Sequence, residues 1–371
     1  MGLFSSRRVK SVDEKFADYV TKELGDAENL DVTEEVLQRF AQEAVDPFTD
    51  KMSQKVAELI LADVGTFRQN AKQDRGFDRR LKKRWGEAFR VFQIAQACAQ
   101  EAGERALQKE IDGLTSEQRA CWQALVELHA KACRVAGEVY ALLSRGFPEG
   151  ALARCRTLHE FAVTASVIGN SMDDAAHGDL AQRFLDHEII ANFRQAKQYQ
   201  MDYRSLNLPP VEDEVIERLE KRYEEMIAKY GEEFKREYGW AKRYCPDDNF
   251  RALESKAGMA HMRSYYQWAS GEVHSGARGV RLNSSEFRGR RILRVGKTNS
   301  GLAEPASMAI NSLRQTTFVL LVKGTGGEVD MTDLVSMKAL EILRKKTSEE
   351  FSAAQAVVDR SEEKFSKERR T

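Results

Sequence analysis

Proline is scarce in this chain, and its scarcity limits the folds that the sequence can adopt. Six prolines occur among 371 residues, where an average usage of about 5% would supply about three times as many. Because proline ends or kinks helices and marks the turns of β folds, so few of them favour long helices. The prolines lie at positions 47, 148, 209, 210, 246 and 305. We therefore expect an all-α protein in which several helices end near these positions.

Hydrophobic periodicity and turn residues divide the chain further. Helices are expected at 12–25, 31–45, 49–110, 116–145, 149–169, 174–205, 212–240, 250–275, 302–323 and 332–369. Thr115 and Ser116 precede one of these segments as capping residues. The domains expected from this division are an N-terminal helical extension (1–115), a core helical bundle (116–323) and a C-terminal helical tail (324–371).

One segment has the alternation of a strand. Residues 279–283 and 291–295 alternate between apolar and polar side chains around a polar turn. This pattern predicts one small β-hairpin at about 279–296 in an otherwise helical protein.

Charge and cysteine content narrow the function classes. The 58 basic and 58 acidic residues cancel, which argues against nucleic-acid binding through bulk basicity, although local basic patches remain. The cysteines (Cys98, Cys121, Cys133, Cys155 and Cys245) form no Cys-x-x-Cys pair. They therefore indicate free thiols in a reducing compartment. With no apolar run of about 18 residues and no signal-peptide core, we expect a cytoplasmic protein.

The N-terminus matches a lipidation motif. Met1-Gly2 begins a myristoylation-like pattern ending at Ser6, and Arg7, Arg8 and Lys10 follow it. The motif is short enough to arise by chance, and a single acyl chain anchors a protein only marginally. We therefore expect no membrane association.

The 149–169 segment places charges on a face that should be buried. Arg156 and His159 fall in the same stripe as Leu152 and Cys155, and Glu160 lies at its edge. A buried guanidinium needs a carboxylate partner. The group is either a structural Arg–Glu pair or part of a pocket for an anion or a nucleotide, and the sequence leaves both open.

Two further segments carry candidate functional residues. His187 shares an apolar face in 174–205, with Arg183 beside it. In 250–275, one stripe holds Arg263, Ser270 and His274. His274 is the strongest single candidate, because histidine is the side chain whose ordinary pKa lies nearest neutral pH.

Several familiar motifs fail. The His159-Glu160 and His187-Glu188 pairs lack the second histidine of a zinc protease. Gly296-Lys297-Thr298 has its nearest preceding glycine at Gly289, with six residues between the two glycines where a P-loop has four. The sequence therefore predicts no metal site and no cofactor.

Three stretches resemble a known family. They are Ala151 to Glu160, Arg183 to His187, and Tyr266 through Ser270 to His274-Ser275. Over roughly 116–323 the chain resembles a prokaryotic family of all-helical proteins catalogued only as a domain of unknown function. The resemblance implies a helical bundle in which Arg156, Glu160, His187, Ser270 and His274 approach one another. It implies no activity.

A looser similarity is to the helical ribonucleases of toxin and defence systems, which pair two helices around an Arg-x(4–6)-His motif. The chain departs from that motif, because Arg263 precedes His274 by eleven residues and Arg278 follows it. Ribonuclease chemistry needs a base, an acid and a cation. His187, His274 and Arg156 would supply them only if the fold brings them together.

Two functions therefore remain open. One is a metal-independent nuclease or related effector of prokaryotic stress or antiviral defence, with His274 and His187 as the acid–base pair, Arg156 and Glu160 at the phosphate, and Arg183, Arg263 and Ser270 binding an RNA or nucleotide substrate. The other is a non-enzymatic binding or regulatory module. Its Arg–Glu–His network would be structural, and its long charged helices would engage a partner protein or a second copy of the chain.

Overall fold

The structure, a computed structural model, describes residues 11–25, 34–274, 276–282, 284–287, 290–324, 326–327 and 329–367. The chain divides into two compact units, one extending to Phe77 and the other beginning at Asp78. The protein is all-α in class, as predicted.

The smaller unit is a helical hairpin followed by the start of a long helix. It contains α1 (Val12–Gly25), α2 (Glu34–Ala62) and the beginning of α3 (Val64–Leu107). Phe16 and Tyr19 of α1 pack against Phe48 of α2, with ring centroids 5.1 and 5.4 Å apart. This packing holds residues on both sides of Pro47 in one helix, so the predicted helix end at Pro47 is wrong.

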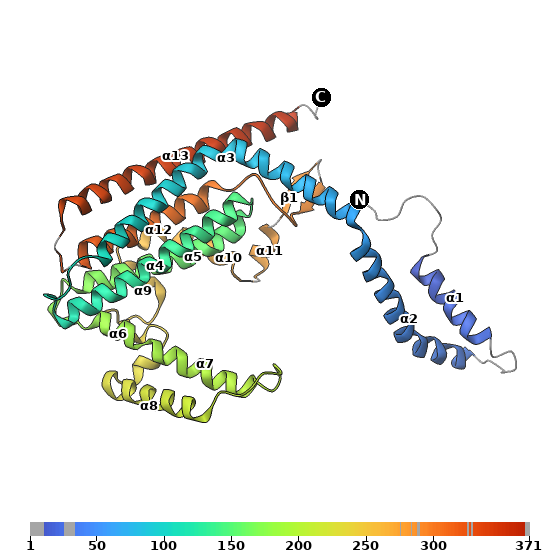
Figure 1. The fold of residues 1–371 in the computed structure, drawn as a ribbon, viewed down its shortest axis with the longest axis horizontal. Coiled ribbons are helices and arrows are strands. Elements are labelled where there is room, and N and C mark those ends of the chain that lie inside the picture. The colour runs from blue at the N-terminus through green and yellow to red at the C-terminus, as the bar shows by residue number, and fades with distance from the viewer. Residues whose placement is uncertain are drawn as a thin grey trace. The chain divides into compact units, whose positions relative to one another are not determined.

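The larger unit consists of the rest of α3 and the elements that follow it (Figure 1). Its α-helices are α4 (Ser116–Ser144), α5 (Pro148–Ser171), α6 (Leu180–Asp186), α7 (Glu188–Asp202), α8 (Asp213–Tyr230), α9 (Phe250–Lys256), α10 (Arg263–Gly271), α11 (Ala277–Leu282), α12 (Ala303–Lys323) and α13 (Met331–Lys367). Short 3-10 helices lie at η1 (Ala175–His177), η2 (Glu232–Lys235), η3 (Gly239–Ala241) and η4 (Ala260–Met262).

The core surrounds α5, which packs against α4, α10 and α12. α12 also packs against α13 (Figure 1). Aromatic side chains extend this core to α3, where Trp85 lies 5.7 Å from Phe351 of α13 and Phe92 lies 6.1 Å from Tyr140 of α4, between ring centroids. The apolar faces of α3 and α13 are therefore part of the larger unit, which is wider than residues 116–323.

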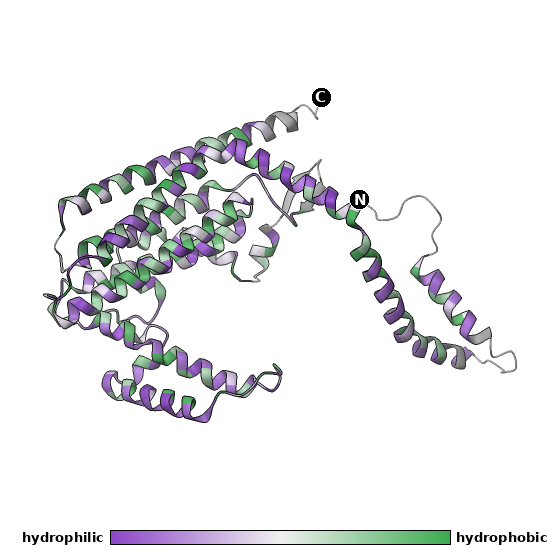
Figure 2. Ribbon diagram, viewed as in Figure 1, coloured by the Kyte–Doolittle hydropathy of each residue, from purple (hydrophilic) through white to green (hydrophobic). Residues whose placement is uncertain are grey.

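Local signals set the starts of the two central helices. Thr115 forms a capping box with Gln118 at the start of α4, as its position predicts. Pro148 is the first residue of α5, where its missing N–H costs no hydrogen bond. α8 has mostly hydrophilic residues along its length, as Figure 2 shows, and pairs with α7 through Phe193 and Tyr223.

Four predicted helices are interrupted. The 49–110 segment is divided at Asp63, between α2 and α3. The 174–205 segment is divided at His187, between α6 and α7. The 212–240 segment ends as an α-helix at Gly231, and the 250–275 segment is broken near Gly258. Both glycines have positive φ, 88° and 72°, a conformation that stops a helix and that side chains other than glycine rarely adopt. Hydrophobic periodicity alone does not detect such single-residue breaks.

The β-hairpin is not formed as predicted. Residues 279–282, expected in its first strand, lie in helix α11. A shorter antiparallel pairing joins β1 (Ser284–Phe287) to β2 (Arg290–Leu293). The alternating run 279–283 is only five residues long. So short a run does not distinguish a strand from one turn of helix.

The state of the cysteines agrees with the prediction of free thiols. All five cysteines are free thiols. Burial raises the pKa of the Cys121 and Cys133 thiols to about 12, so both are protonated at neutral pH. Among the described residues, no helix has the length and apolar character needed to cross a membrane.

Two glycines of α3 offer a matched test of the packing between α3 and α4. A Cβ on residue 103 would lie 2.5 Å from Cε1 of the buried His129, whereas one on residue 86 would meet only Lys82, at 3.9 Å. Gly103→Ala is expected to lower the free energy of unfolding by about 1–3 kcal/mol because it overpacks the interface. Gly86→Ala should be neutral or stabilising, since alanine has the higher helix propensity. Urea denaturation measures both, and equal effects would contradict this close packing.

Candidate functional site

The candidate site is a cluster of polar side chains where α5 meets α10. Arg156 donates from Nε to Glu160 Oε1 at 3.0 Å and to the Tyr266 hydroxyl at 3.2 Å. Its Nη1 lies 2.9 Å from His274 Nε2. The Tyr266 hydroxyl donates to Glu160 Oε1 at 2.9 Å. These four residues, Arg156, Glu160, Tyr266 and His274, are called the arginine cluster below.

Two helices position the arginine cluster. Arg156 and Glu160 are one turn apart on α5, so their side chains meet on one face. Tyr266 is held on α10, where the Ser270 hydroxyl donates to its main-chain carbonyl at 2.8 Å. α10 ends at Gly271, and the residues after that end bring His274 back to α5. This geometry joins residues 118 positions apart in the sequence.

The arginine cluster contains a charged guanidinium that is paired with the Glu160 carboxylate. Burial lowers the pKa of Arg156, but hydrogen bonding and the charge of Glu160 outweigh it, and the net pKa is raised. Burial and the bond to Glu160 also raise the pKa of Tyr266, so this hydroxyl keeps its proton. Arginine has no acceptor, so His274 Nε2 must accept in its contact with Arg156. His274 itself is exposed. The cluster thus offers an accessible imidazole beside a guanidinium.

A second polar network lies beneath the arginine cluster. His159 Nε2 lies 3.0 Å from Glu254 Oε1, and Arg263 Nη1 donates to Glu254 Oε2 at 2.8 Å. His159 and Glu254 are buried. Burial lowers the pKa of His159, although Glu254 partly opposes this effect. A neutral histidine and an Arg–Glu ion pair therefore hold α5, α9 and α10 together.

Tyr266 connects the two networks. The guanidinium carbons of Arg156 and Arg263 lie 5.2 and 5.1 Å from the centroid of its ring. The His159 ring lies 5.7 Å away. Burial is the main cause that raises the pKa of Tyr238, and Tyr266 and Glu160 are close enough to contribute to the same effect. A partly buried base therefore supports the half-buried Arg156 and the exposed His274.

The structure does not bring His187 into the arginine cluster. Its Nε2 lies 3.0 Å from the main-chain oxygen of Phe234 and 2.9 Å from that of Arg236. Burial lowers its pKa below the ordinary value. The contacts of His187 fix the segment that leads to Tyr238. His187 differs from His274 in two respects. It lies directly after the last residue of α6, and its ring contacts main-chain carbonyls.

The three residues predicted to bind substrate have separate surroundings. Arg183 is buried, donates to the Trp240 carbonyl at 3.2 Å and lies 4.5 Å from the centroid of the Tyr230 ring. Arg263 belongs to the buried network, and Ser270 hydrogen-bonds within α10. Ser270 is therefore next to the arginine cluster through Tyr266, whereas the contacts of Arg183 lie around Trp240 and Tyr230.

An Arg-x(4)-His spacing does occur on α5, between Arg154 and His159, but the two side chains face different ways. Arg154 pairs with Glu138 of α4 at 2.7 Å, while His159 is buried against Glu254. Five positions along a helix turn the side chain through about 500°, which leaves the two residues well apart around the axis. This spacing therefore forms no site here.

Two important residues were not among the predicted site residues. Tyr266 lies in one of the stretches that carry the family resemblance, but it was not singled out as a site residue. Glu254 was detectable, since it shares an apolar stripe with Phe250, Leu253 and Ala257 at spacings typical of one helix face. A carboxylate inside such a stripe indicates a buried ionic partner.

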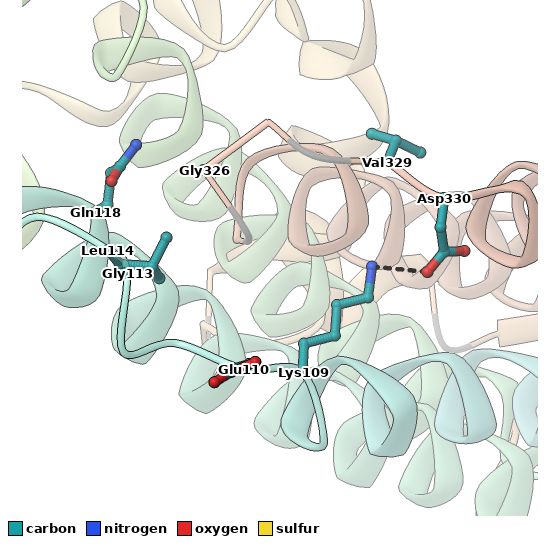
Figure 3. A pocket seen from close by; sticks show the side chains of 8 residues that line it. All are labelled: Lys109, Glu110, Gly113, Leu114, Gln118, Gly326, Val329 and Asp330. Carbon is teal, nitrogen blue, oxygen red and sulfur yellow. Dashed lines mark ion pairs between the residues drawn. The ribbon is translucent and has the colours of Figure 1, made fainter.

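The structure contains a pocket away from the arginine cluster, and Figure 3 shows it. It has a volume of about 770 Å³ and lies at the loops that join α3 to α4 and α12 to α13. Its cation, Lys109, is paired with Asp330 at 3.2 Å and also with Asp333. Within the described ranges, no group of three or more His, Cys, Asp or Glu residues is arranged to hold a metal ion. The arginine cluster remains the best candidate.

Comparison with known proteins confirms the resemblance to a domain of unknown function. Residues 123–289 match the model of a family of unknown function (DUF5677). No curated protein matches the chain. No solved structure matches it either. The matched range contains the whole arginine cluster and the buried network beneath it, so both belong to the part of the chain that resembles this family.

Proposed function

We propose that the arginine cluster is the active site of a metal-independent ribonuclease. The contact of 2.9 Å between Arg156 and His274 carries the proposal. A phosphate seated there would contact a guanidinium, the side chain best suited to phosphate oxygens. It would also lie beside an imidazole that takes and returns protons near neutral pH.

In this mechanism each residue has a separate role. His274 Nε2, an acceptor in the structure, takes the proton of the RNA 2′-hydroxyl as that oxygen attacks the adjacent phosphorus. Arg156 stabilises the negative charge that develops on the phosphate oxygens. Glu160 and Tyr266 orient Arg156 through its Nε, and the phosphate would take the place of His274 Nε2 as the acceptor for Nη1. The products would be a 2′,3′-cyclic phosphate and a free 5′-hydroxyl, with the final proton supplied by solvent.

The test is cleavage of RNA by the purified full chain in the presence of a chelator. His274→Ala and Arg156→Ala are each expected to lower the rate by about 100-fold or more, the usual effect of losing a proton-transfer group or a charge-stabilising donor. The matched controls are His261→Ala, an exposed histidine on η4, and Arg154→Ala, an arginine on α5 that pairs with Glu138. Both should cleave at the rate of the wild type.

The proposal is wrong if the wild type leaves RNA intact, or if His274→Ala cleaves as fast as the wild type. A role in stress or phage defence adds a cellular expectation. Expression of the wild type should slow bacterial growth, and His274→Ala should not. Equal growth of the two strains would contradict the proposed role in defence.

A second candidate function is a binding module, and exposed apolar side chains favour it. In the smaller unit Leu59, Ile60, Leu61 and Phe67 are exposed where α2 ends and α3 begins. Exposed apolar side chains that gather into a patch are typical of interaction surfaces, and these four lie within nine residues of one another in the sequence. Light scattering of the wild type and of Leu59→Ser/Ile60→Ser tests self-association. A wild type that is monomeric at all concentrations would exclude a second copy as the partner.

A further inference from the structure

A cavity is lined by residues close in sequence to the arginine cluster, and its polar side chains have been given no role above. It has a volume of about 320 Å³ and lies between the start of α5, the end of α10 and the segment after β2. Its polar side chains are Glu149, Glu272, Arg294 and Glu304, and Trp268 and Leu152 contribute apolar surface. The volume is at the lower end of the range of small-molecule sites and suits one small ring system.

The cavity and the arginine cluster are built on the same two helices. Leu152 of the cavity is one turn before Arg156 on α5, about 6 Å along the axis. Glu272 of the cavity is two residues before His274. A ligand whose phosphate contacts Arg156 would therefore have its adjoining group at the mouth of this cavity.

The lining presents both acceptors and a donor. Arg294 Nη2 lies 2.7 Å from Glu149 Oε1, so these two side chains neutralise one another. Glu272 is half-buried beside them. Burial and the nearby Glu149 raise the pKa of Glu272, while Arg294 opposes this effect. Glu304 is exposed at the rim. The cavity thus offers carboxylate oxygens close to a guanidinium, with the Trp268 ring alongside.

This combination distinguishes among the bases of RNA. Guanine presents two neighbouring N–H donors, at N1 and at the exocyclic amine, which a single carboxylate accepts together. It also presents the O6 and N7 acceptors that arginine recognises. Adenine and cytosine carry an unprotonated ring nitrogen next to their amino group, which repels a carboxylate. Uracil has a single N–H donor. Aromatic side chains bind any of the four rings by stacking.

We propose that this cavity binds the guanine base of the RNA substrate, with Glu272 accepting from the base and Trp268 packing against its ring. The proposal rests on the proposed function, because it places the phosphate of the same nucleotide at Arg156. Arg156 is the reason to prefer the base of a nucleotide to an organic cation, since only a ligand that carries an anionic group would also engage that guanidinium.

The test is the affinity of the full chain for the 3′-monophosphates of guanosine, adenosine, cytidine and uridine (GMP, AMP, CMP and UMP), measured by titration calorimetry. GMP is expected to bind at least tenfold more tightly than the other three. Glu272→Gln should lower the affinity for GMP by about 5- to 150-fold, the range for losing a paired contact to a base. Glu272→Asp keeps the charge but has a shorter side chain, so its affinity for GMP should lie between those of the wild type and of Glu272→Gln. Glu138→Gln, at a half-buried glutamate of α4, is the matched control.

Arg156→Ala provides an internal comparison. Since Arg156 is assigned to the phosphate, its loss should weaken binding of all four nucleotides by a similar factor. Equal affinity for all four nucleotides in the wild type would overturn the guanine assignment, and so would an unchanged GMP affinity in Glu272→Gln. Binding of methylguanidine in place of GMP would also overturn it, in favour of an organic cation.

The same measurements separate the two proposals. Selective binding of GMP by a chain that cleaves no RNA would support the guanine site and refute the ribonuclease. Cleavage of RNA at every base, with Glu272→Gln cleaving like the wild type, would support the ribonuclease and refute the guanine site.

Discussion

Glu254→Ala is expected to lower the free energy of unfolding by about 3–5 kcal/mol, the cost of removing one partner of a buried ion pair. Glu254 is 0% exposed and accepts from both His159 and Arg263. Its loss leaves a buried imidazole without its acceptor and a guanidinium without its counter-charge. Urea denaturation at neutral pH, followed by circular dichroism, measures the change.

Three variants make this prediction specific. Glu254→Gln keeps an oxygen for Arg263 and should lose less stability than the alanine variant. Glu127→Ala, at an exposed glutamate of α4, should leave stability almost unchanged. The triple variant His159→Phe/Glu254→Leu/Arg263→Met replaces the whole network and is expected to be more stable than Glu254→Ala. If Glu254→Ala is as stable as the Glu127→Ala control, the buried network does not stabilise the fold.

Acidification from about pH 7 to about pH 5 is expected to destabilise the protein strongly, because three histidines have lowered pKa values in the folded state. Burial is the largest cause for His129, His159 and His187, and it lowers the pKa of His129 to about 4. An unfolded chain takes up protons as the pH falls below about 6.5, the ordinary histidine pKa, whereas the folded protein does not. Stability is therefore lost from that pH downward.

His129 provides the quantitative test. With a folded pKa of about 4, it should account for about 2 kcal/mol of the stability lost between about pH 7 and about pH 5. His129→Gln is expected to reduce the pH dependence by that amount, while keeping a partner for Thr317, which lies 3.1 Å from the His129 ring. His261→Gln, at an exposed histidine, is the control. An unchanged slope in His129→Gln would show that His129 does not titrate as a buried group.

Much of the helical architecture follows from local sequence. Thr115 with Gln118 and Pro148 mark the starts of α4 and α5 because the first turn of a helix has main-chain donors that its own residues cannot satisfy. Where prediction failed, one residue outweighed the pattern. Gly258 breaks the long predicted helix through its positive φ, and Phe48 keeps α2 continuous past Pro47 through its packing on α1.

The candidate site was predictable only in part. Arg156 and Glu160 are neighbours on one helix face, so their pairing is visible in the spacing. The approach of His274 to Arg156 depends on where α10 begins and ends. A break of a few residues near Gly258 changes the rotation of every later side chain about the helix axis. Tyr266 and His274 both follow that break, and both reach Arg156.

The sequence by itself determined that the protein is all-α, where α4 and α5 begin, and that α5 carries charges on a face meant for the core. These properties depend on residues within a few turns of one another. Only the tertiary structure decided that His274 joins Arg156 while His187 binds main-chain carbonyls, and that Glu254 lies beneath the cluster. Those pairings join residues 47 to 118 positions apart. Such distances in sequence are closed by packing of whole helices, which no local pattern encodes.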